Sequence, residues 1–373
     1  MDNICIPSIW FWQLIISPHM AHLAVSLAQL GCKVTYVAES EMTADRTDQG
    51  WKAPELPGVK LEWASSDMAV RQLIQAAAPD SIHVCQGVRA NGRVAVAQRV
   101  LTERGLRQWV VMETVDDSGW RGIVKRLEYG RLFRAQRNIL QGVLTMGHQT
   151  ADWVAARGVP SQRIFPFAYF LPKSPLTPRH LNRTHGPFRF LFVGRMITLK
   201  RVDWLINSLA ALKCDSFELW LVGGGEDEPA LRELANQNLD SRVRWLGSFP
   251  MLQVPSIMAQ ADCLVLPSIH DGWGAVASEA LMVGTPVICS DACGVAGVVR
   301  ASGVGGVFPV NNSAALHTLL DAQLTKGIVD YAARSSLKEW ASCIGADAGA
   351  KYLQKILISP PEHQYKKIIS PWE

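Results

Sequence analysis

The chain lacks several features that mark other classes of protein. No run of about 20 consecutive apolar residues occurs in its 373 residues, so no membrane-spanning helix is expected. Charged residues make up only 19% of the chain and the formal net charge is +4, which is too little to indicate a nucleic-acid partner. The eight cysteines include no CxxC pair, so we expect buried thiols in a cytoplasmic protein rather than a zinc site.

The N-terminal segment is apolar but does not resemble a signal peptide. Asp2 occupies a position where a signal peptide needs positive charge, and Pro18 interrupts the segment. We therefore interpret residues 2–9 as a first buried strand. A helix is predicted after it, with Ser17 as the N-cap, Pro18 in the first turn and Gly31 at the C-terminal end.

Short apolar runs alternate with helical stretches along the chain, which is typical of parallel α/β sheets. The length also exceeds what one hydrophobic core usually supports, so two domains are expected. Residues 171–187 interrupt the alternation with prolines and basic residues, which indicates a linker. We predict an N-terminal domain over 1–172, a linker over 173–187 and a C-terminal domain over 188–354. The last helix, at about 355–373, is a candidate to return to the first domain.

The first segment with chemical interest is FVGRMITLKR. A strand over 188–193 ends at Gly194, followed by Arg195 and, five residues later, Lys200. Open α/β sheets bind ligands outside the carboxyl ends of their strands. Two cations at such a turn can hold a diphosphate, although a solvated basic turn explains this segment alone equally well.

A second segment, SIHDGWGAVASEALMVGTPVICSD, contains two acids eight residues apart, Asp271 and Glu279. A helix is predicted to begin near Gly274 or Ala275, and its free N–H groups attract phosphate. Glu279 would lie about one turn into this helix, where a carboxylate can accept hydrogen bonds from adjacent ribose hydroxyls. The structural alternative makes Asp271 a helix cap and Glu279 a favourable first-turn charge.

Together with the glycines at 223–225, these segments resemble the retaining GT-B glycosyltransferases of family 4. In that family a glycine–arginine turn, a lysine about five residues on, and two acids separated by seven residues and followed by G-x-PV bind the nucleotide sugar. The matching residues here are Gly194, Arg195, Lys200, Asp271, Glu279, Gly284 and Pro286. The resemblance covers residues 188–310 well, and it implies two Rossmann-like domains that face each other across a cleft.

The resemblance also implies roles for individual residues. Arg195 and Lys200 would hold the diphosphate of a UDP- or GDP-sugar, Glu279 the ribose, and Asp271 the donor-sugar hydroxyls. Further donor contacts are implied at Gly224 and through the backbone amides of Gly272, Trp273, Gly274, Ala275 and Val276. No cofactor or metal is expected, because two cations already serve the leaving group.

The implied activity is a metal-independent transfer of a hexosyl group to a saccharide or lipid-linked saccharide, with retention of configuration, in bacterial polysaccharide or glycolipid assembly. A sugar epimerase or hydrolase on the same scaffold would need acid and base residues facing the sugar carbons, and we identify none. A non-catalytic sugar-binding relative is the third possibility, although Arg195, Lys200, Asp271 and Glu279 argue against it.

Three positions depart from the family pattern. The first acid is Asp271, where the family usually has glutamate. Glu113 follows a strand where the family often has histidine; it either binds acceptor or donor sugar or is a satisfied polar group at the strand end. Residues 10–12, Trp-Phe-Trp, replace the usual glycine-rich first loop, and they either stack on a sugar or lipid or pack in the core.

Residues 120–138 contain six basic residues and one acid, Glu128, with apolar residues interspersed. Such a helix suits an anionic membrane surface and a peripheral position on the inner face of the membrane. A solvated basic helix packed on its domain is the alternative.

Overall fold

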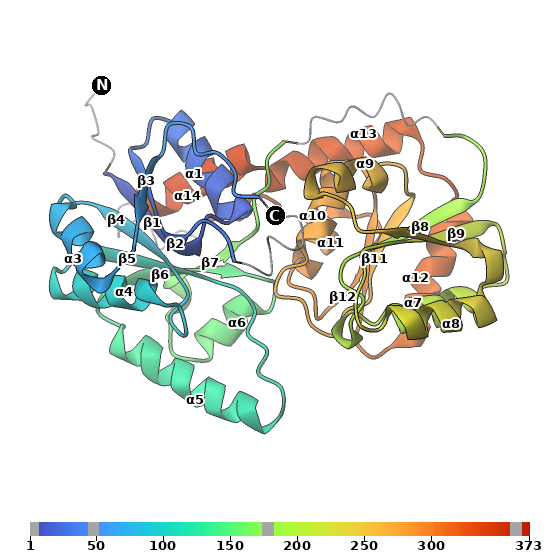
Figure 1. Cartoon of the computed structure of the whole chain (residues 1–373), viewed down its shortest axis with the longest axis horizontal. Coiled ribbons are helices and arrows are strands. Elements are labelled where there is room, and N and C mark those ends of the chain that lie inside the picture. Colours follow the sequence, from blue (N-terminus) through green and yellow to red (C-terminus); the bar gives the residue numbers. More distant parts are fainter. Residues whose placement is uncertain (1–6, 44–51, 174–182, 359–367) are drawn as a thin grey trace. The chain divides into compact units, whose positions relative to one another are not determined.

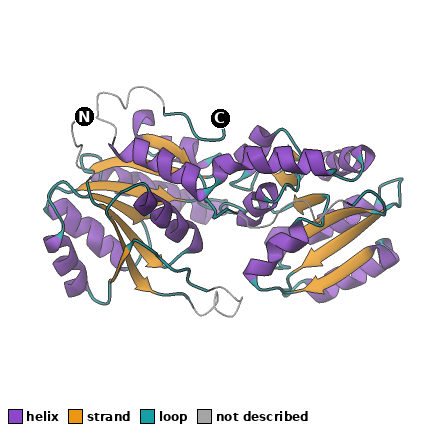
Figure 2. Cartoon of the chain, turned by 90° about the horizontal axis from the view of Figure 1, so that it is seen from above, coloured by secondary structure: helices purple, strands orange, loops and turns teal. Residues whose placement is uncertain are grey.

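The structure, a computed structural model, describes residues 7–43, 52–173, 183–358 and 368–373 (Figure 1). The chain divides into two compact units. Unit 1 consists mainly of Met1–Pro172 and Ile344–Pro371, and unit 2 of Lys173–Cys343. Each unit is a parallel sheet with helices on both faces (Figure 2), which confirms the predicted fold class of two Rossmann-like domains.

Unit 1 is built on a seven-stranded parallel sheet with the order β3-β2-β1-β4-β5-β6-β7. Its strands are β1 (Ile9–Ile15), β2 (Val34–Ser40), β3 (Lys60–Trp63), β4 (Ile82–Gln86), β5 (Arg107–Met112), β6 (Leu140–Met146) and β7 (Ile164–Phe167). Its helices are α1 (Pro18–Gln29), α3 (Asp67–Ala76), α4 (Arg93–Glu103), α5 (Gly119–Ala135), α6 (Thr150–Ala155) and α14 (Ala346–Ile358).

The predicted first strand over 2–9 lies partly outside the described residues, which begin at residue 7, and within them only Ile9 belongs to a strand. β1 begins at Ile9, and it contains Trp10, Phe11 and Trp12, which are only 8%, 0% and 1% exposed. The indole N–H of Trp12 donates a hydrogen bond to Nδ1 of His83, at 3.0 Å. These aromatic residues therefore belong to the core and not to a sugar- or lipid-binding loop. The physical reason is that a central parallel strand is covered on both faces and needs an unbroken apolar run.

The helix that follows agrees with the prediction. Ser17 is the N-cap of α1, and its Oγ accepts a hydrogen bond from the amide of Met20, at 3.4 Å. Pro18 occupies the first position of the helix. Gly31 follows the helix with a φ of +87°, which glycine adopts without strain.

Unit 2 is built on a six-stranded parallel sheet with the order β10-β9-β8-β11-β12-β13. Its strands are β8 (Phe188–Val193), β9 (Phe217–Val222), β10 (Val243–Gly247), β11 (Cys263–Leu266), β12 (Val287–Ser290) and β13 (Gly306–Phe308). Its helices are α7 (Val202–Ala210), α8 (Glu228–Asn238), α9 (Val254–Met258), α10 (Ala275–Met282), α11 (Ala296–Ser302), α12 (Ser313–Lys326) and α13 (Tyr331–Trp340).

The core of unit 2 positions the loops that matter below. Alternate residues of β8, Phe188, Phe190 and Phe192, are buried in one apolar cluster with residues of α7, α8 and α12. The strand order reverses between β8 and β11, which are neighbours in the sheet. In open α/β sheets such a reversal separates the loops at the carboxyl edge and leaves room for a ligand.

The chain returns to unit 1 at Ile344, earlier than residue 355, near which the sequence analysis placed the return. α14 packs against α1, and Ser26 Oγ donates a hydrogen bond to the Asp347 carboxylate, at 3.0 Å. The Tyr352 hydroxyl donates to the carbonyl of Pro166, at 2.9 Å. Residues 174–182 of the predicted linker and residues 359–367 lie outside the described part of the chain.

Candidate functional site

The loop after β8 is fastened to the loop after β9. The amide of Met196 donates to the carbonyl of Gly224 at 2.9 Å, and the amide of Asp227 donates to the carbonyl of Met196 at 3.0 Å. Gly223 has a φ of +117°, and a Cβ there would lie 2.1 Å from the carbonyl oxygen of Gly194. Only glycine fits this position, so the glycine-rich turn first serves the close approach of the two loops.

An ion pair crosses the point at which the strand order reverses. Lys200, which ends a short 3₁₀ turn after β8, places its Nζ 2.6 Å from a carboxylate oxygen of Asp271, which follows β11. Both side chains are mostly buried, with exposed fractions of 23% and 17%. The amide of Ile269 also donates to the carbonyl of Leu199, at 2.9 Å, so backbone and side chains join the two loops. The structure thus brings together the predicted cation and the predicted first acid.

The backbone of Asp271 is held from the other side as well. Its amide donates to the carbonyl of Ala292, and its carbonyl accepts from the amide of Gly294, at 3.2 and 3.0 Å. This double contact fixes the residue in a short parallel bridge with the segment after β12. The carboxylate is therefore presented at the carboxyl edge of the sheet by rigid neighbours.

Arg195 differs from Lys200 in having no partner. Its side chain is exposed, and the described residues offer it no hydrogen bond or ion pair. An unpaired guanidinium directly after a strand end can bind a phosphate or carboxylate with two parallel hydrogen bonds.

α10 begins where the sequence predicted, directly after Gly274, which adopts a left-handed φ of +89°. No side chain caps this end of the helix, so the amides of its first turn are available to an acceptor group. The side chain of Trp273 is 2% exposed and its indole N–H donates to Ser278 Oγ at 3.1 Å, so the ring packs inside unit 2. The ring therefore anchors the first turn of α10, and the donor contact predicted for this residue is one through its backbone amide.

Glu279 lies in the second turn of α10 and is mostly buried. Its carboxylate has no hydrogen-bond or ion-pair partner among the described residues. Burial raises the pKa of Glu279 from its ordinary value of 4.5 to about 7. A buried acid without a protein partner is costly to keep charged, which marks it as a candidate to bind hydroxyl groups of a ligand.

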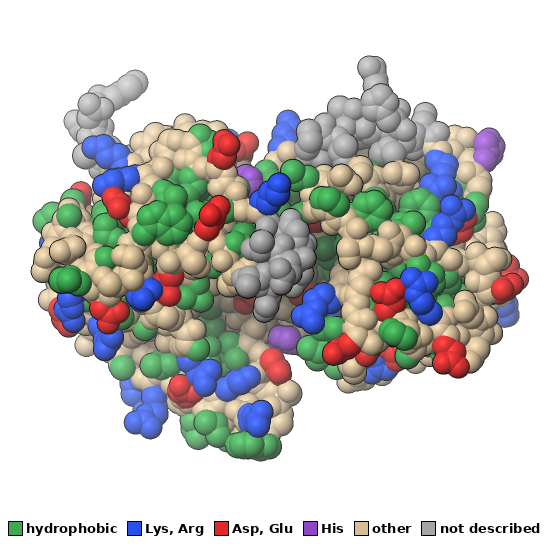
Figure 3. All heavy atoms as spheres, in the orientation of Figure 1, with side chains coloured by type: hydrophobic (Ala, Val, Ile, Leu, Met, Phe, Trp, Pro, Cys, Tyr) green, Lys and Arg blue, Asp and Glu red, His purple; other side chains and the backbone are tan. Residues whose placement is uncertain are grey.

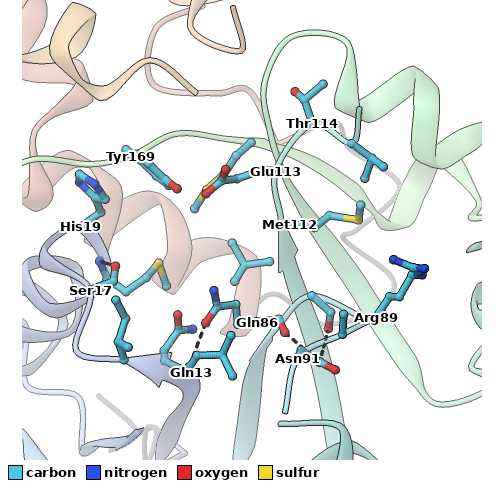
Figure 4. Close-up of a pocket in the computed structure, with 18 of the residues that line it drawn as sticks. Gln13, Ser17, His19, Gln86, Arg89, Asn91, Met112, Glu113, Thr114 and Tyr169 are labelled. Carbon is cyan, nitrogen blue, oxygen red and sulfur yellow. Dashed lines mark hydrogen bonds between the residues drawn. The ribbon is translucent and has the colours of Figure 1, made fainter. Parts of the chain in front are cut away.

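Unit 1 contains a separate cavity of about 500 Å³ at the carboxyl ends of its own strands (Figure 4). Glu113, which directly follows β5, is exposed and lines it. Polar side chains from several other elements also line it: Gln13 of β1, Ser17 and His19 at the start of α1, Gln86 at the end of β4, Arg89, Asn91, and Tyr169. The rings of His19 and Tyr169 stack with their centroids 4.0 Å apart. Such a polar cavity of this size suits a small hydrophilic ligand.

Comparison with known families gives a match within unit 2. Residues 175–339 match the glycosyl transferases group 1. The matched segment contains the loops after β8, β9 and β11 and the whole of α10, so it includes Arg195, Lys200, Asp271 and Glu279. The cavity of unit 1 lies outside it.

Individual glycosyltransferases are similar to this chain in sequence or in fold. The chain is 26% identical to the amylovoran biosynthesis glycosyltransferase AmsK of Erwinia amylovora over 212 residues. This alignment covers 54% of this chain and 51% of that protein. It thus spans about half the length of the curated relatives that it matches. Its fold is similar to that of the lipopolysaccharide outer core galactosyltransferase WaaB, with a TM-score of 0.72, 16% identity and coverage of 94% and 99% of the two chains. Anabaena Alr3699/HepE, solved in complex with UDP, gives a TM-score of 0.70 at 15% identity, with coverage of 94% and 99%.

Sequence reasoning singled out the unit 2 residues that lie within the group 1 match, but it missed most of the residues that line the unit 1 cavity. Gln13 lies inside an apolar strand and Gln86 ends one, and neither was singled out. A polar residue within an otherwise apolar strand was the available signal. In the part of the chain that the structure describes, no group of three or more His, Cys, Asp or Glu side chains is placed to hold a metal ion, and no helix is long and apolar enough to cross a membrane.

Proposed function

We propose that this protein is a glycosyltransferase that moves a sugar from a nucleotide-sugar donor to an acceptor hydroxyl, in the assembly of a polysaccharide or glycolipid. The observation that carries the proposal is the Lys200–Asp271 pair at the carboxyl edge of the unit 2 sheet, with the unpaired Arg195 on the same loop as Lys200. The group 1 match of this segment supports it, as does a fold shared with a protein solved in complex with UDP.

The donor would be bound by charge and by hydrogen bonds. Arg195 and Lys200 would neutralise the diphosphate, together with the uncapped amides at the start of α10. The Asp271 carboxylate would accept hydrogen bonds from sugar hydroxyls, and Glu279 from those of the ribose. The nucleobase and the sugar of the donor are left open by these residues.

Catalysis would depend on stabilising the negative charge of the leaving group. Departure of a nucleoside diphosphate places negative charge on the phosphate beside Arg195 and Lys200, where fixed cations lower the barrier most. One such preorganised donor is worth roughly 3 kcal/mol in other enzymes. Retention of anomeric configuration and independence from metal follow the family 4 pattern and are part of the proposal.

The acceptor would enter the cavity of unit 1. Its lining offers hydroxyl-binding amides and an acid, Gln13, Gln86, Asn91 and Glu113, which suits a saccharide. Glu113 is the one titratable carboxylate among these residues and is our candidate for contact with the acceptor hydroxyl.

The first test is thermal unfolding of the protein with UDP, GDP, UDP-glucose, UDP-galactose and GDP-mannose. A ligand at a hundred times its Kd adds about 2.7 kcal/mol to the stability, which raises the melting temperature measurably. The K200A variant should lose the shift, whereas K213A, which removes an exposed positive charge after α7, should keep it. No shift with any of the five ligands would overturn the donor assignment.

A second measurement separates transfer from hydrolysis. Release of nucleoside diphosphate from a stabilising donor is followed with and without a cell-envelope saccharide extract. We expect release to depend on the extract, and the anomeric configuration of the product, read by NMR, to match that of the donor. Equal release without the extract would favour a hydrolase, and an inverted product would contradict retention.

A further inference from the structure

α5 carries an apolar stripe that faces solvent. Four large residues, Trp120, Ile123, Val124 and Leu127, are 72%, 54%, 55% and 68% exposed. They follow the spacing i, i+3, i+4, i+7, so they lie on one face of the helix. Large apolar side chains gathered in this way mark an interaction surface, because isolated ones are common and contiguous ones are not.

Positive charge continues the same face. Arg131 and Arg134 follow Leu127 by four and seven residues, so they extend the stripe toward the C-terminal end of α5, and both are exposed. Neither has an ion-pair partner among the described residues. The single acid of the helix, Glu128, is already neutralised by Arg89, whose Nε lies 2.6 Å from its carboxylate. Figure 3 shows hydrophobic and basic side chains together at the lower end of unit 1, where Figure 1 places α5.

The opposite side of α5 is firmly attached to unit 1. Phe133 is buried, and the ring of Tyr129 meets that of Trp153 edge-on, with centroids 5.0 Å apart. The Asp117 carboxylate, just before the helix, accepts hydrogen bonds from Trp153 Nε1 at 2.8 Å and Arg126 at 3.1 Å. The exposed stripe is therefore a fixed feature of a well-packed helix and not the result of a loosely attached one.

The same helix forms a wall of the unit 1 cavity. Lys125 and Tyr129 line the cavity together with Glu113, and both side chains project from faces of α5 other than the exposed stripe. A ligand in the cavity and a partner on the stripe would thus contact one helix from different sides.

We propose that the outer face of α5 binds the surface of an anionic lipid bilayer, and that the cavity behind it receives the head group of a lipid-linked acceptor. The second part rests on the proposed function. A bilayer fits better than a protein groove, because apolar side chains can enter the interfacial region while unpaired arginines meet lipid phosphates in the same plane. The stripe supplies the first kind of contact and Arg131 and Arg134 the second.

The test is co-sedimentation of the protein with vesicles of phosphatidylcholine alone or with 30% phosphatidylglycerol. We expect binding to the anionic vesicles at low salt, weakened as salt rises, because the attraction is screened within about 10 Å at 0.1 M salt. Each arginine near an anionic surface contributes about fivefold, so R131Q/R134Q should bind roughly 30-fold more weakly. The W120S/L127S variant should bind more weakly to both kinds of vesicle.

A matched control removes two positive charges elsewhere on unit 1. Lys33 and Arg99 are exposed and lie outside α5, and K33Q/R99Q should bind as tightly as wild type. Equal binding of R131Q/R134Q and wild type, or no binding of wild type at low salt, would overturn the proposal. If W120S/L127S instead changed only the oligomeric state in sedimentation velocity, a second copy of the chain would be the partner, which also overturns it.

Failure of this proposal is distinguishable from failure of the proposed function. Thermal stabilisation by nucleotide sugars reports on unit 2 and should be the same for wild type and for both α5 variants. If the wild-type protein binds vesicles but no nucleotide sugar, the membrane-binding role of α5 is supported and the proposed transferase function is contradicted. The reverse result would leave a transferase that acts on an acceptor in solution.

Discussion

Glu279 gives the sharpest prediction, because its protonation should control donor binding near neutral pH. Burial holds its pKa at about 7, and no group in the described part of the chain pairs with it. With that pKa, about one tenth of the molecules carry the carboxylate at pH 6 and about nine tenths at pH 8. If only the carboxylate accepts both ribose hydrogen bonds, the apparent donor affinity rises roughly tenfold from pH 6 to pH 8.

The assay is isothermal titration calorimetry with a stabilising nucleotide sugar at pH 6, 7 and 8. A nucleotide sugar is better than a nucleoside diphosphate, because a terminal phosphate titrates near pH 6 and would confuse the result. E279Q keeps the shape of the side chain but does not titrate, so its affinity should be flat with pH. E233Q, which changes an exposed acid on α8, should retain the full rise.

A flat profile for wild type, or the same rise in E279Q, would refute the role of Glu279. The same pKa shift also affects folding, with the opposite dependence. The folded pKa lies above the unfolded one, so the native protein holds an extra proton between pH 4.5 and 7. The stability of wild type relative to E279Q should therefore fall as pH rises through this window, which thermal unfolding in buffers from pH 4 to 8 would measure.

Three further predictions concern the donor site. R195A and K200A should each lower turnover by roughly two to three orders of magnitude in a steady-state assay, as for other preorganised donors, and turnover within threefold of wild type for both would contradict the diphosphate assignment. Activity should persist in excess EDTA, since the proposed leaving-group stabilisation comes from side chains, whereas complete loss restored by manganese or magnesium would reverse that view. G223A should destabilise unit 2 by more than about 1 kcal/mol in denaturant unfolding, because its Cβ would strike the Gly194 carbonyl, while G224A, without a positive φ, should have a smaller effect.

The unit 2 residues were predictable from sequence because each follows a strand closely. Arg195 comes two residues after β8, and Asp271 five residues after β11. Once the strands are recognised, the edge of the sheet on which these side chains lie is fixed. The ion pair between Lys200 and Asp271 was not predicted. The two residues are 71 positions apart in the sequence, and they meet only because β8 and β11 are neighbours in the sheet.

The cavity of unit 1 could not be predicted in this way. Gln13 and Gln86 come together because β1 and β4 are neighbours, and Gln86 accepts a hydrogen bond from the amide of Leu14, 72 residues away. For α5, the sequence showed six basic residues. Which face of the helix is buried depends on Tyr129, which meets Trp153 of α6, and on Phe133, which shares an apolar cluster with Val154 of α6. The aromatic run of β1 was misplaced because apolar residues after a strand and within one look alike until the strand's neighbours are known.

The return of α14 to unit 1 affects the order in which the chain can fold during synthesis. α14 buries Ala350, Leu353 and Ile356 completely within unit 1, next to α1. The ribosome makes these residues only after Lys173–Cys343, the segment that forms nearly all of unit 2. Until α14 is made, one face of unit 1 therefore stays uncovered, whereas nearly all of the unit 2 sequence is already present. We therefore expect the second unit to reach its native state first, and a nascent chain that ends before Ala346 to need protection by chaperones.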